Sequence, residues 1–493
     1  MEKVNEHVQV RLDKLEKLKA LGVNPYPNDI VSDNEISQII SDYDQFSKEE
    51  LEENVRTVSV SGRIVSRRDM GKAAFITIKD NLDQIQCYVA QANLTDLENE
   101  VFSLLDLGDF VYIKGEVMKT KIGAIAIRAK ELKIITKAIA PLPEKFHGLT
   151  DIEERYRKRY IDLAVNDDAK KVFIDRSHII ASIRNYLNEN GYLEVETPTL
   201  QTVAGGAAAQ PFITHHNTLD IDMYMRIAPE LYLKRLIVGG FDKVYELGKQ
   251  FRNEGISIKH NPEFTSIEIY TTYQEMHGVM QLCEDVIKCA AKPLHPDLKF
   301  IYEDVEYDLN NFKKIHMVDL IKEVTGVDFW QVNDINEAKA LAKANNIELE
   351  DHHYDIGHII NEFFEQRCEE TLIQPTFVYG HPKAISPLAR IDESDPRFTE
   401  RFELFIGGRE YANGFSELND PMDQYQRFAS QVKERELGNV EATEIDYDFV
   451  NALAIGMPPT GGLGIGIDRL VMLLTNSSSI RDVILFPTMR GRK

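Results

Sequence analysis

Two segments far apart in the chain constrain its fold more than any other feature of the sequence. The first, Phe251 to Thr265, carries Arg252 near its start and Phe264 near its end. The second, Gly461 to Leu470, has glycines at positions 461, 462, 464 and 466 and then Arg469. An arginine held on a strand can bind a phosphate and a carboxylate at once through its planar fork, and a glycine run lets the backbone approach a nucleotide closely. The two segments therefore indicate one nucleotide site built from distant parts of the chain.

The glycine run does not match the better-known nucleotide signatures. Its glycines lack the G-x-G-x-x-G spacing of dinucleotide-binding folds, and no G-K-[ST] follows them as in a P-loop. A lone Arg-Asn-Glu is usually a solvated stretch, and a lone glycine run is usually a turn. The co-occurrence of two long segments in a fixed order, with a third match upstream, favours a functional site over these structural explanations.

The two segments resemble motifs 2 and 3 of the class II aminoacyl-tRNA synthetases, in the order of that family. Upstream, an apolar stripe over Phe173 to Asn190 stops at Gly191, and the predicted strand Tyr192 to Pro198 follows. This unit resembles motif 1, through which the family forms a homodimer. The resemblance implies an α+β fold, in which helices flank an antiparallel sheet, and ATP-dependent activation of an amino acid.

Composition fits an intracellular enzyme. The chain has 493 residues, enough for two or three domains, with 43% hydrophobic and 28% charged residues. Its four cysteines form no C-x-x-C pair, so neither a disulfide framework nor a zinc ribbon is indicated. The amino terminus lacks the apolar core of a signal peptide, and no run approaches 18 apolar residues. We expect a soluble, cytoplasmic protein with no membrane partner.

The net charge of −23 argues against a nucleic-acid partner only if the charge is evenly spread. It is not, because the segment from Arg56 to Lys79 has six basic residues against one acid, and Gly115 to Ala140 has six against two. An acidic body thus carries a basic amino-terminal module, as a tRNA-binding protein requires.

The basic module has the pattern of a small β-barrel. Strands are predicted over residues 55–65, 73–79, 84–90, 109–118 and 122–135, with a helix over 95–105 between the third and the fourth. This is the plan of an OB-fold, which binds single-stranded oligonucleotides. The stretches 60–64, 72–76 and 85–88 resemble the anticodon-binding domain of the lysyl-, aspartyl- and asparaginyl-tRNA synthetases. The resemblance implies anticodon contacts by Arg63, Phe75 and Gln86.

The chain divides into four predicted parts. Residues 1–54 form an amino-terminal helical extension, and residues 55–140 the OB-fold domain. Residues 141–170 are a linker or hinge that begins near Pro141-Leu142-Pro143. Residues 171–493 form the catalytic domain, with a helical insertion at about 293–390.

Three further stretches resemble the lysine-specific members of the family: Ala204 to Phe212, Arg226 to Lys234, and Asn413 to Asp420. Several glutamates among apolar neighbours imply a cationic ligand, because glutamates are seldom buried unless they are paired. The lysine-binding residues implied by the resemblance are Gly206, Glu230, Arg252, Glu268, Tyr270, Asn413, Phe415 and Glu417. The implied ATP-binding residues are Arg252, Glu254, His260, Asn261, Phe264, Glu403 and Arg469.

The resemblance also implies the reaction. Arg252 and Arg469 are the expected catalytic residues, and Glu403 and Glu410 the expected ligands of Mg²⁺, which favours hard oxygen donors. ATP and L-lysine give lysyl-adenylate, and the lysyl group passes to the 3′ end of tRNA(Lys). Two alternatives remain: a non-enzymatic tRNA-binding relative, which we expect to have lost some of these residues, and a protein-lysylating paralogue, which we expect to lack the OB-fold.

Overall fold

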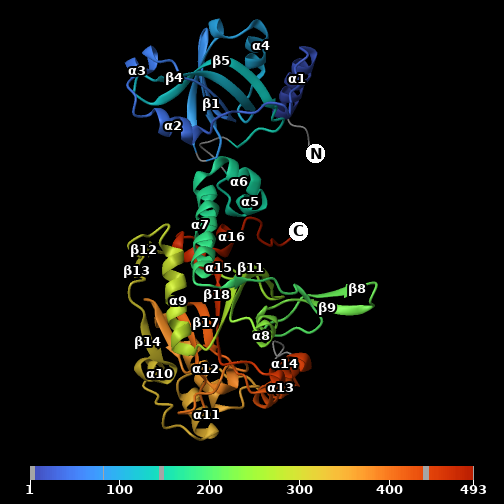
Figure 1. Ribbon diagram of the computed structural model, residues 1–493, viewed down its shortest axis with the longest axis vertical. Helices are drawn as coiled ribbons and strands as arrows, with labels where there is room; N and C mark the ends of the chain where they lie inside the picture. Colours follow the sequence, from blue (N-terminus) through green and yellow to red (C-terminus); the bar gives the residue numbers. More distant parts are fainter. Residues whose placement is uncertain (1–5, 82, 144–148, 437–443, 492–493) are drawn as a thin grey trace. The chain divides into compact units, whose positions relative to one another are not determined.

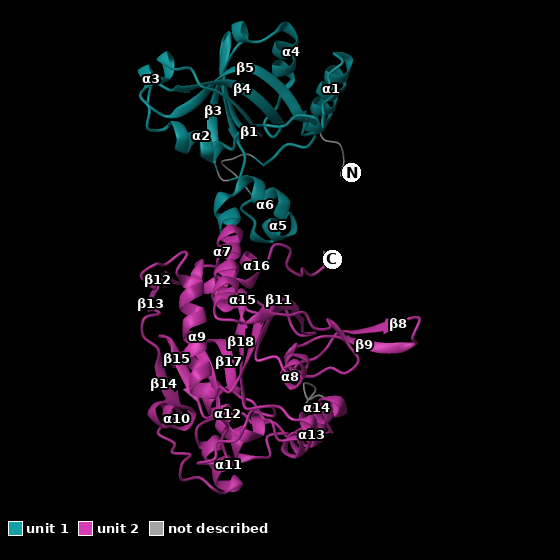
Figure 2. Ribbon diagram, viewed as in Figure 1, with its two compact units in different colours: residues 1–171 teal, residues 172–493 magenta. Residues whose placement is uncertain are grey.

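The computed structural model describes residues 6–81, 83–143, 149–436 and 444–491. The chain divides into two compact units, Met1–Lys171 and Val172–Lys493, coloured separately in Figure 2. Helix α7 (Asp167–Glu189) crosses this division. Part of the predicted linker, residues 144–148, lies outside the described residues.

Unit 1 contains a closed five-stranded barrel with the strand order β1-β2-β3-β5-β4. Its strands are β1 (Thr57–Met70), β2 (Ala73–Lys79), β3 (Gln84–Ala90), β4 (Phe110–Lys119) and β5 (Ile125–Thr136). Helix α4 (Asp96–Leu104) lies between β3 and β4 in the sequence and begins at a Thr95–Glu98 capping box. Buried and less buried residues alternate along β2, as a barrel wall requires. The predicted OB-fold barrel is confirmed.

The segment before the barrel contributes to the same hydrophobic core. It forms α1 (Glu6–Ala20), α2 (Ile36–Tyr43) and α3 (Lys48–Glu53). Leu18, Ile36 and Leu51, one from each helix, are buried in one cluster with the barrel's interior residues. Two short helices, α5 (Ile152–Arg157) and α6 (Arg159–Val165), follow the barrel.

Unit 2 is built on an eight-stranded sheet with the order β14-β15-β16-β17-β18-β11-β10-β6 (Figure 1). Its strands are β6 (Leu193–Glu194), β10 (Lys243–Phe251), β11 (Glu263–Thr272), β14 (Lys313–His316), β15 (Thr376–Tyr379), β16 (Arg401–Ile406), β17 (Arg409–Ser416) and β18 (Thr460–Gly466). All neighbours pair antiparallel except β14 with β15 and β6 with β10. This sheet, with the helices beside it, confirms the predicted α+β class.

Three helices cover one face of the sheet, and the site lies on the opposite face. Ile267 and Ile269 of β11 are buried in a cluster with residues of α7, α9 (Met276–Ala291) and α15 (Ile467–Leu474). Side chains alternate along a strand, so the intervening Glu268 and Tyr270 point to the opposite face. The same alternation puts Leu463 of β18 in the helix-covered core and turns Gly462 and Gly464 toward the open face.

The strand predicted over residues 192–198 is shorter in the structure. Only β6, Leu193–Glu194, pairs with β10, in parallel. Further along, the Thr197 backbone N–H donates to the Glu246 side chain rather than to a neighbouring strand. Pro198 then supplies no donor at all.

The segment 293–390 forms a mixed subdomain. Helices α10 (Met317–Thr325), α11 (Ile335–Ala344) and α12 (Ile356–Arg367) are buried around residues such as Phe329 and Phe363 in a separate core cluster. The segment also contains the hairpin β12 (Lys299–Tyr302) and β13 (Val305–Asp308). It contributes β14 and β15 to the main sheet as well, so it is not purely helical.

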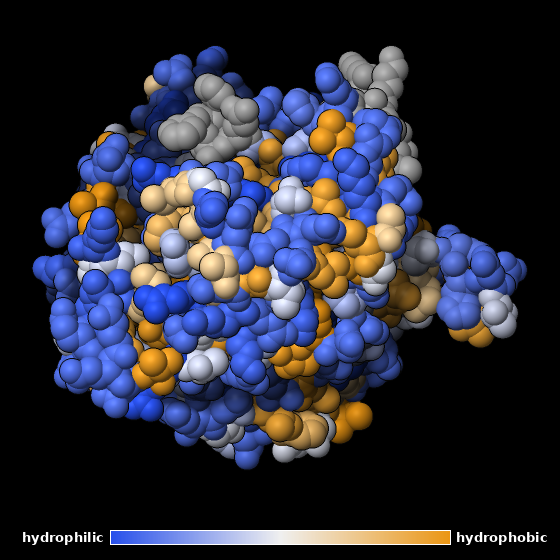
Figure 3. Space-filling view, turned by 90° about the horizontal axis from the view of Figure 1, so that it is seen from above, coloured by the Kyte–Doolittle hydropathy of each residue, from blue (hydrophilic) through white to orange (hydrophobic). Residues whose placement is uncertain are grey.

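In the described part of unit 2, a small sheet and four α-helices remain. A three-stranded sheet has the order β7-β9-β8, with β7 (Leu200–Gln201), β8 (Ile213–His216) and β9 (Ile221–Met225). The other helices are α8 (Glu230–Val238), α13 (Pro421–Glu436), α14 (Tyr447–Ile455) and α16 (Ile480–Val483). Hydrophilic residues cover most of the face seen in Figure 3. Within the described ranges, no helix is both long and apolar enough to cross a membrane.

Candidate active site

A pocket opens on the face of the sheet opposite to α7, α9 and α15. Its floor is made by β10, β11, β18 and β17. Strand register places Glu268, Gly464 and Asn413 side by side across β11, β18 and β17. The next row, displaced by two residues, is Tyr270, Gly462 and Phe415. The two sequence segments that first indicated the site thus lie on adjacent strands.

The glycines of β18 leave the centre of the pocket floor without side chains. A Cβ atom added at Gly464 would meet no described atom nearer than 3.8 Å, so it would project into the pocket. One added at Gly462 would overlap Glu417 Oε1 and lie 2.8 Å from the Tyr270 ring. Gly464 therefore leaves room for a ligand, and Gly462 leaves room for the close approach of Glu417 and Tyr270.

Arg252 and Phe264 form one side of the pocket. The Arg252 guanidinium lies 5.2 Å from the centroid of the Phe264 ring. Its backbone N–H donates to the Pro262 carbonyl, which closes the base of the motif 2 loop. Among the described residues, nothing accepts a hydrogen bond from the buried Arg252 Nε. The guanidinium is thus available to an anionic ligand.

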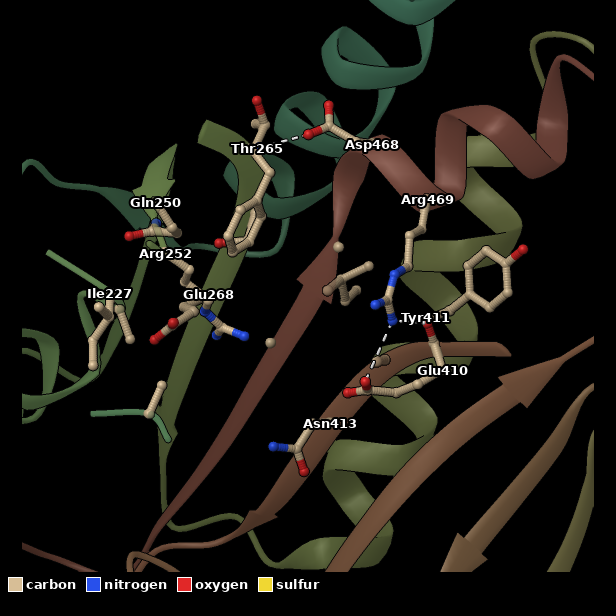
Figure 4. Close-up of a pocket in the computed structure, with 18 of the residues that line it drawn as sticks. Ile227, Gln250, Arg252, Thr265, Glu268, Glu410, Tyr411, Asn413, Asp468 and Arg469 are labelled. Atoms are coloured by element: carbon tan, nitrogen blue, oxygen red, sulfur yellow. Dashed lines mark hydrogen bonds and ion pairs between the residues drawn. The ribbon is translucent and has the colours of Figure 1, made fainter. Parts of the chain in front are cut away.

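Arg469 enters from the other side of β18, as Figure 4 shows. Its Nη1 donates to the Glu410 carbonyl at 2.8 Å, and Nη2 lies 3.3 Å from His260 Nε2. Burial, and next the charge of Arg469, lower the pKa of His260, which favours a neutral imidazole. The preceding residue, Asp468, accepts hydrogen bonds from the Thr265 backbone and from Arg176. These bonds fix the start of α15 against β11.

Two carboxylates beside Arg469 form an acidic end suited to a hard cation. Glu403 pairs with Arg401 at 2.6 Å, and Arg401 Nε also donates to Asn413 Oδ1. Burial, and next the negative charge of Glu403, raise the pKa of Glu410. A divalent cation would relieve both effects, so these oxygens fit Mg²⁺.

The opposite end of the pocket is also acidic. Glu268 is partly buried and accepts a hydrogen bond from the Tyr270 hydroxyl at 3.0 Å. Burial, and next the charge of Glu230, raise the pKa of Glu268 to about 8. Glu230 stands at the first turn of α8 and faces Gly206, whose φ of +91° suits glycine. Such a cluster needs a cationic ligand to ionise fully.

Glu417 lies behind the floor and is paired with a lysine of the protein itself. Its side chain is fully buried, and Lys234 Nζ is in ion-pair contact with Oε2. Lys234 also pairs with Glu230 Oε1 at 2.6 Å. Lys234 Nζ donates a hydrogen bond to Glu230 Oε1, whereas its ion pair with Glu417 lacks hydrogen-bond geometry. In the described part of the chain, neither Glu417 oxygen accepts a hydrogen bond.

Most of the predicted site residues line this one pocket. They are Gly206, Glu230, Arg252, Glu254, His260, Asn261, Phe264, Glu268, Tyr270, Glu403, Glu410, Asn413, Phe415 and Arg469. Glu417 is the exception. The Asn261 amide is engaged with backbone atoms of Glu263 and Thr488, so its role is at least partly structural.

Sequence reasoning missed the partners of these residues. Lys234 and Arg401 each contact two predicted site residues. Gln250 lines the pocket, and its buried amide has no hydrogen-bond partner within the described ranges. A signal for Lys234 existed, since it follows Glu230 by four residues on a helix, the spacing of an ion pair.

The barrel of unit 1 carries the other predicted contacts on its outer surface. Phe75 is partly exposed between the buried Ala74 and Ile76, and its ring lies 5.1 Å from that of Tyr88. Strand register places Gln86 opposite Thr77, on the same face as Phe75. The Arg63 guanidinium packs 4.3 Å from the centroid of the Phe110 ring. A partly exposed aromatic pair beside the exposed Gln86 suits stacking with bases.

Comparisons with known proteins agree with both units. The description "tRNA synthetases class II (D, K and N)" matches residues 151–490, and "OB-fold nucleic acid binding domain" matches residues 58–135. The lysine–tRNA ligase of Bacillus subtilis (strain 168) is 54% identical over 492 residues, which is 100% of this chain and 98% of the relative. Those of Lactococcus lactis subsp. lactis (strain IL1403) and Staphylococcus epidermidis (strain ATCC 12228) are also 54% identical, over 99% and 100% of both chains.

Proposed function

The chain belongs to the class II tRNA synthetases of the D, K and N group, and from this premise we propose that it activates L-lysine with ATP and esterifies tRNA(Lys). The observation that carries the proposal is that one pocket joins an arginine-lined nucleotide side to an acidic end. Glu230 and Glu268 line that end, and Glu417 lies behind it. An aspartate-specific pocket would instead need cations for its substrate's side chain.

Activation needs no nucleophile from the protein. The lysine carboxylate attacks the α-phosphorus of ATP, and pyrophosphate leaves in line. Arg252 holds both reactants, Arg469 stabilises the charge that develops on the phosphates, and a neutral His260 lies beside Arg469. Phe264 offers its ring face to adenine. Glu268 receives the α-ammonium of lysine, while Glu230, Tyr270 and Glu417 face its side-chain ammonium.

Mg²⁺ is the proposed cofactor, with Glu403 and Glu410 as its ligands. Bound there, it would neutralise phosphate charge. The support is the pKa of Glu410, which burial raises most and the negative charge of Glu403 raises further.

The outer face of the barrel is the proposed anticodon-binding surface, with Arg63, Phe75 and Gln86 as contacts. The proposed division of the chain keeps the sequence-based bounds: 1–54, 55–140, 141–170 and 171–493. A homodimer through residues 173–198 and a cytoplasmic location also stay predictions.

The two alternative functions are less well supported. A non-enzymatic relative is expected to lose part of the activation machinery, yet Arg252, Glu403, Glu410 and Arg469 all line the pocket. A protein-lysylating paralogue is expected to lack the barrel that unit 1 contains. Charging of a tRNA(Lys) transcript with labelled lysine tests the proposal. Ester formation that requires both ATP and lysine supports it, and lysylation of protein without tRNA charging would overturn it.

Lysine binding should depend on pH through Glu268. Its pKa of about 8 means that the free pocket holds a proton at neutral pH, whereas pairing with the α-ammonium needs the carboxylate. The KM for lysine should therefore fall as pH rises from about 6.5 to 8, by up to about tenfold per pH unit. Glu268→Gln cannot ionise and should show a higher KM with a weaker pH dependence. A parent KM that is flat or rises over this range would contradict the assignment.

Phe75→Ala should weaken tRNA binding while sparing activation. Stacking contributes about 1–3 kcal/mol per base, so the KM for tRNA(Lys) should rise roughly fivefold to 150-fold. Lysine-dependent pyrophosphate exchange, which needs no tRNA, should be unchanged. Ile122→Ala, at a 90% exposed residue in the turn between β4 and β5, is the matched control and should alter neither assay. Equal tRNA KM values for the two variants would remove Phe75 from the anticodon surface.

A further inference from the structure

The acidic end of the pocket, where the substrate lysine is proposed to bind, contains a cation that belongs to the protein. The side chain of Lys234 is fully buried, and its Nζ contacts both Glu230 Oε1 and Glu417 Oε2. The rings of Phe415 and Phe449 lie 5.4 and 5.8 Å from this ammonium. Helix α8 therefore inserts a charged group between two of the acids assigned to the substrate's own ammonium.

We propose that Lys234 is a positioning residue for lysine recognition: it holds one oxygen of Glu230 and one of Glu417, and so leaves the second oxygen of each for the substrate's ammonium. The inference rests on the proposed function and names a specificity residue for the same site. The geometric basis is that Lys234 Nζ contacts one oxygen of each carboxylate, Oε1 of Glu230 and Oε2 of Glu417.

The second oxygens lie where a ligand can use them. Glu417 Oε1 sits against Gly462, which lines the pocket, and has no hydrogen-bond partner among residues that the structure describes. A buried carboxylate oxygen without a partner is costly and calls for a ligand. Glu230 itself lines the pocket.

The charge balance explains why a built-in cation is needed. Glu230 on α8, Glu268 and Tyr270 on β11, and Glu417 after β17 all face this end, and Lys234 lies among them. Burial raises the pKa of Glu417 well above its usual range, and the charge of Lys234 opposes that rise. Burial lowers the pKa of Lys234, but attraction by Glu230 and Glu417 outweighs it, so the ammonium stays charged. Without Lys234, the acids would repel one another and take up protons.

Lys234 also stays in place when substrate enters. Its side chain is enclosed and is 0% exposed, and the aromatic rings near Nζ favour the cation. The substrate ammonium therefore approaches a fixed set of acceptors rather than displacing this lysine.

Lys234→Met, which removes the charge but keeps an unbranched chain, tests the proposal in lysine-dependent pyrophosphate exchange. The KM for lysine at pH 7 should rise roughly thirtyfold or more, the range for breaking a buried charge pair. The KM for ATP should stay within about threefold, a difference of only about 0.6 kcal/mol. The pH at which the KM for lysine levels off should move up by about one unit or more, because the acids lose their cation. A purely structural role would not move this pH profile.

Lys137→Met is the matched control. Lys137 is equally buried and pairs with Asp106 and Asp109 inside the barrel of unit 1. Its replacement should lower stability by breaking a similar ion cluster, yet leave the KM for lysine and its pH profile unchanged. Lys234→Arg keeps the charge and provides a second test if Lys234→Met does not fold. Its pH profile should match that of the parent, and a displaced profile would count against the proposal.

Two outcomes would overturn the inference while leaving the proposed function intact. One is a folded Lys234→Met variant with the parent's KM for lysine and the parent's pH profile. The other is a lower KM, which would show that Lys234 competes with the substrate. Absence of lysine-dependent exchange in the parent protein would instead contradict the proposed function.

Discussion

Replacing Arg252 by alanine is expected to reduce lysine-dependent pyrophosphate exchange roughly a thousandfold or more, because one guanidinium holds both reactants in line. The structure strengthens this expectation. Arg252 Nε has no hydrogen-bond partner within the described ranges, and the guanidinium packs against Phe264. The variant therefore loses little internal bonding and should remain folded.

Lys249→Ala is the control for Arg252→Ala. Lys249 lies on β10, the strand that ends just before Arg252, and alternation along β10 turns its 41% exposed side chain away from the pocket. Its loss should leave exchange within about threefold of the parent, a difference of about 0.6 kcal/mol. Near-normal exchange by a folded Arg252→Ala variant would remove Arg252 from the catalytic site.

Glu417→Gln is expected to reduce kcat/KM for lysine roughly thirtyfold to several thousandfold, which corresponds to about 2 to 5 kcal/mol for a broken buried charge pair. The glutamine keeps the shape of the side chain behind Gly462 but removes the charge that meets the substrate's ammonium. ATP affinity measured without amino acid should change little, because Glu417 lies at the end of the pocket away from Arg469.

A second buried glutamate separates this effect from a general loss of stability. Glu246 is 4% exposed and pairs with Arg226. Any loss of activity in the Glu246→Gln variant should lower the efficiency with lysine and the efficiency with ATP equally. A Glu417→Gln variant with lysine efficiency within about threefold of the parent would show that Glu417 does not bind the ammonium.

The sequence predicts the fold class because its strongest patterns are local. The alternation in Ala73–Lys79 marks a strand whatever it packs against. The sequence gives no clear signal for strand β17, since Asn413-Gly414 weakens its strand pattern and its stability comes from pairing with β16 and β18. The strand predicted over residues 192–198 is too long because the Thr197 backbone N–H donates to the Glu246 carboxylate instead of continuing the pairing of β6 with β10.

The sequence likewise predicts one part of the site and not the other. Residues such as Arg252 and Glu268 could be placed from the resemblance, and the structure brings them to one pocket. The position of Glu417 behind Gly462 could not be predicted, because it depends on the close approach of β17 and β18 and on the ion pair with Lys234. Contacts between side chains from three separate elements leave no periodic trace in a sequence.

Amino-acid selection by the unmodified protein tests the central claim most directly, namely that the acidic end of the pocket selects a cationic substrate. Pyrophosphate exchange should be measured in parallel with L-lysine, L-aspartate and L-asparagine. These are the amino acids that the one-letter codes K, D and N denote in the description of the family. We expect kcat/KM for lysine to exceed the other two roughly a thousandfold or more, because either competitor leaves buried carboxylates without a partner. Comparable exchange with aspartate or asparagine, or none with lysine, would contradict the account.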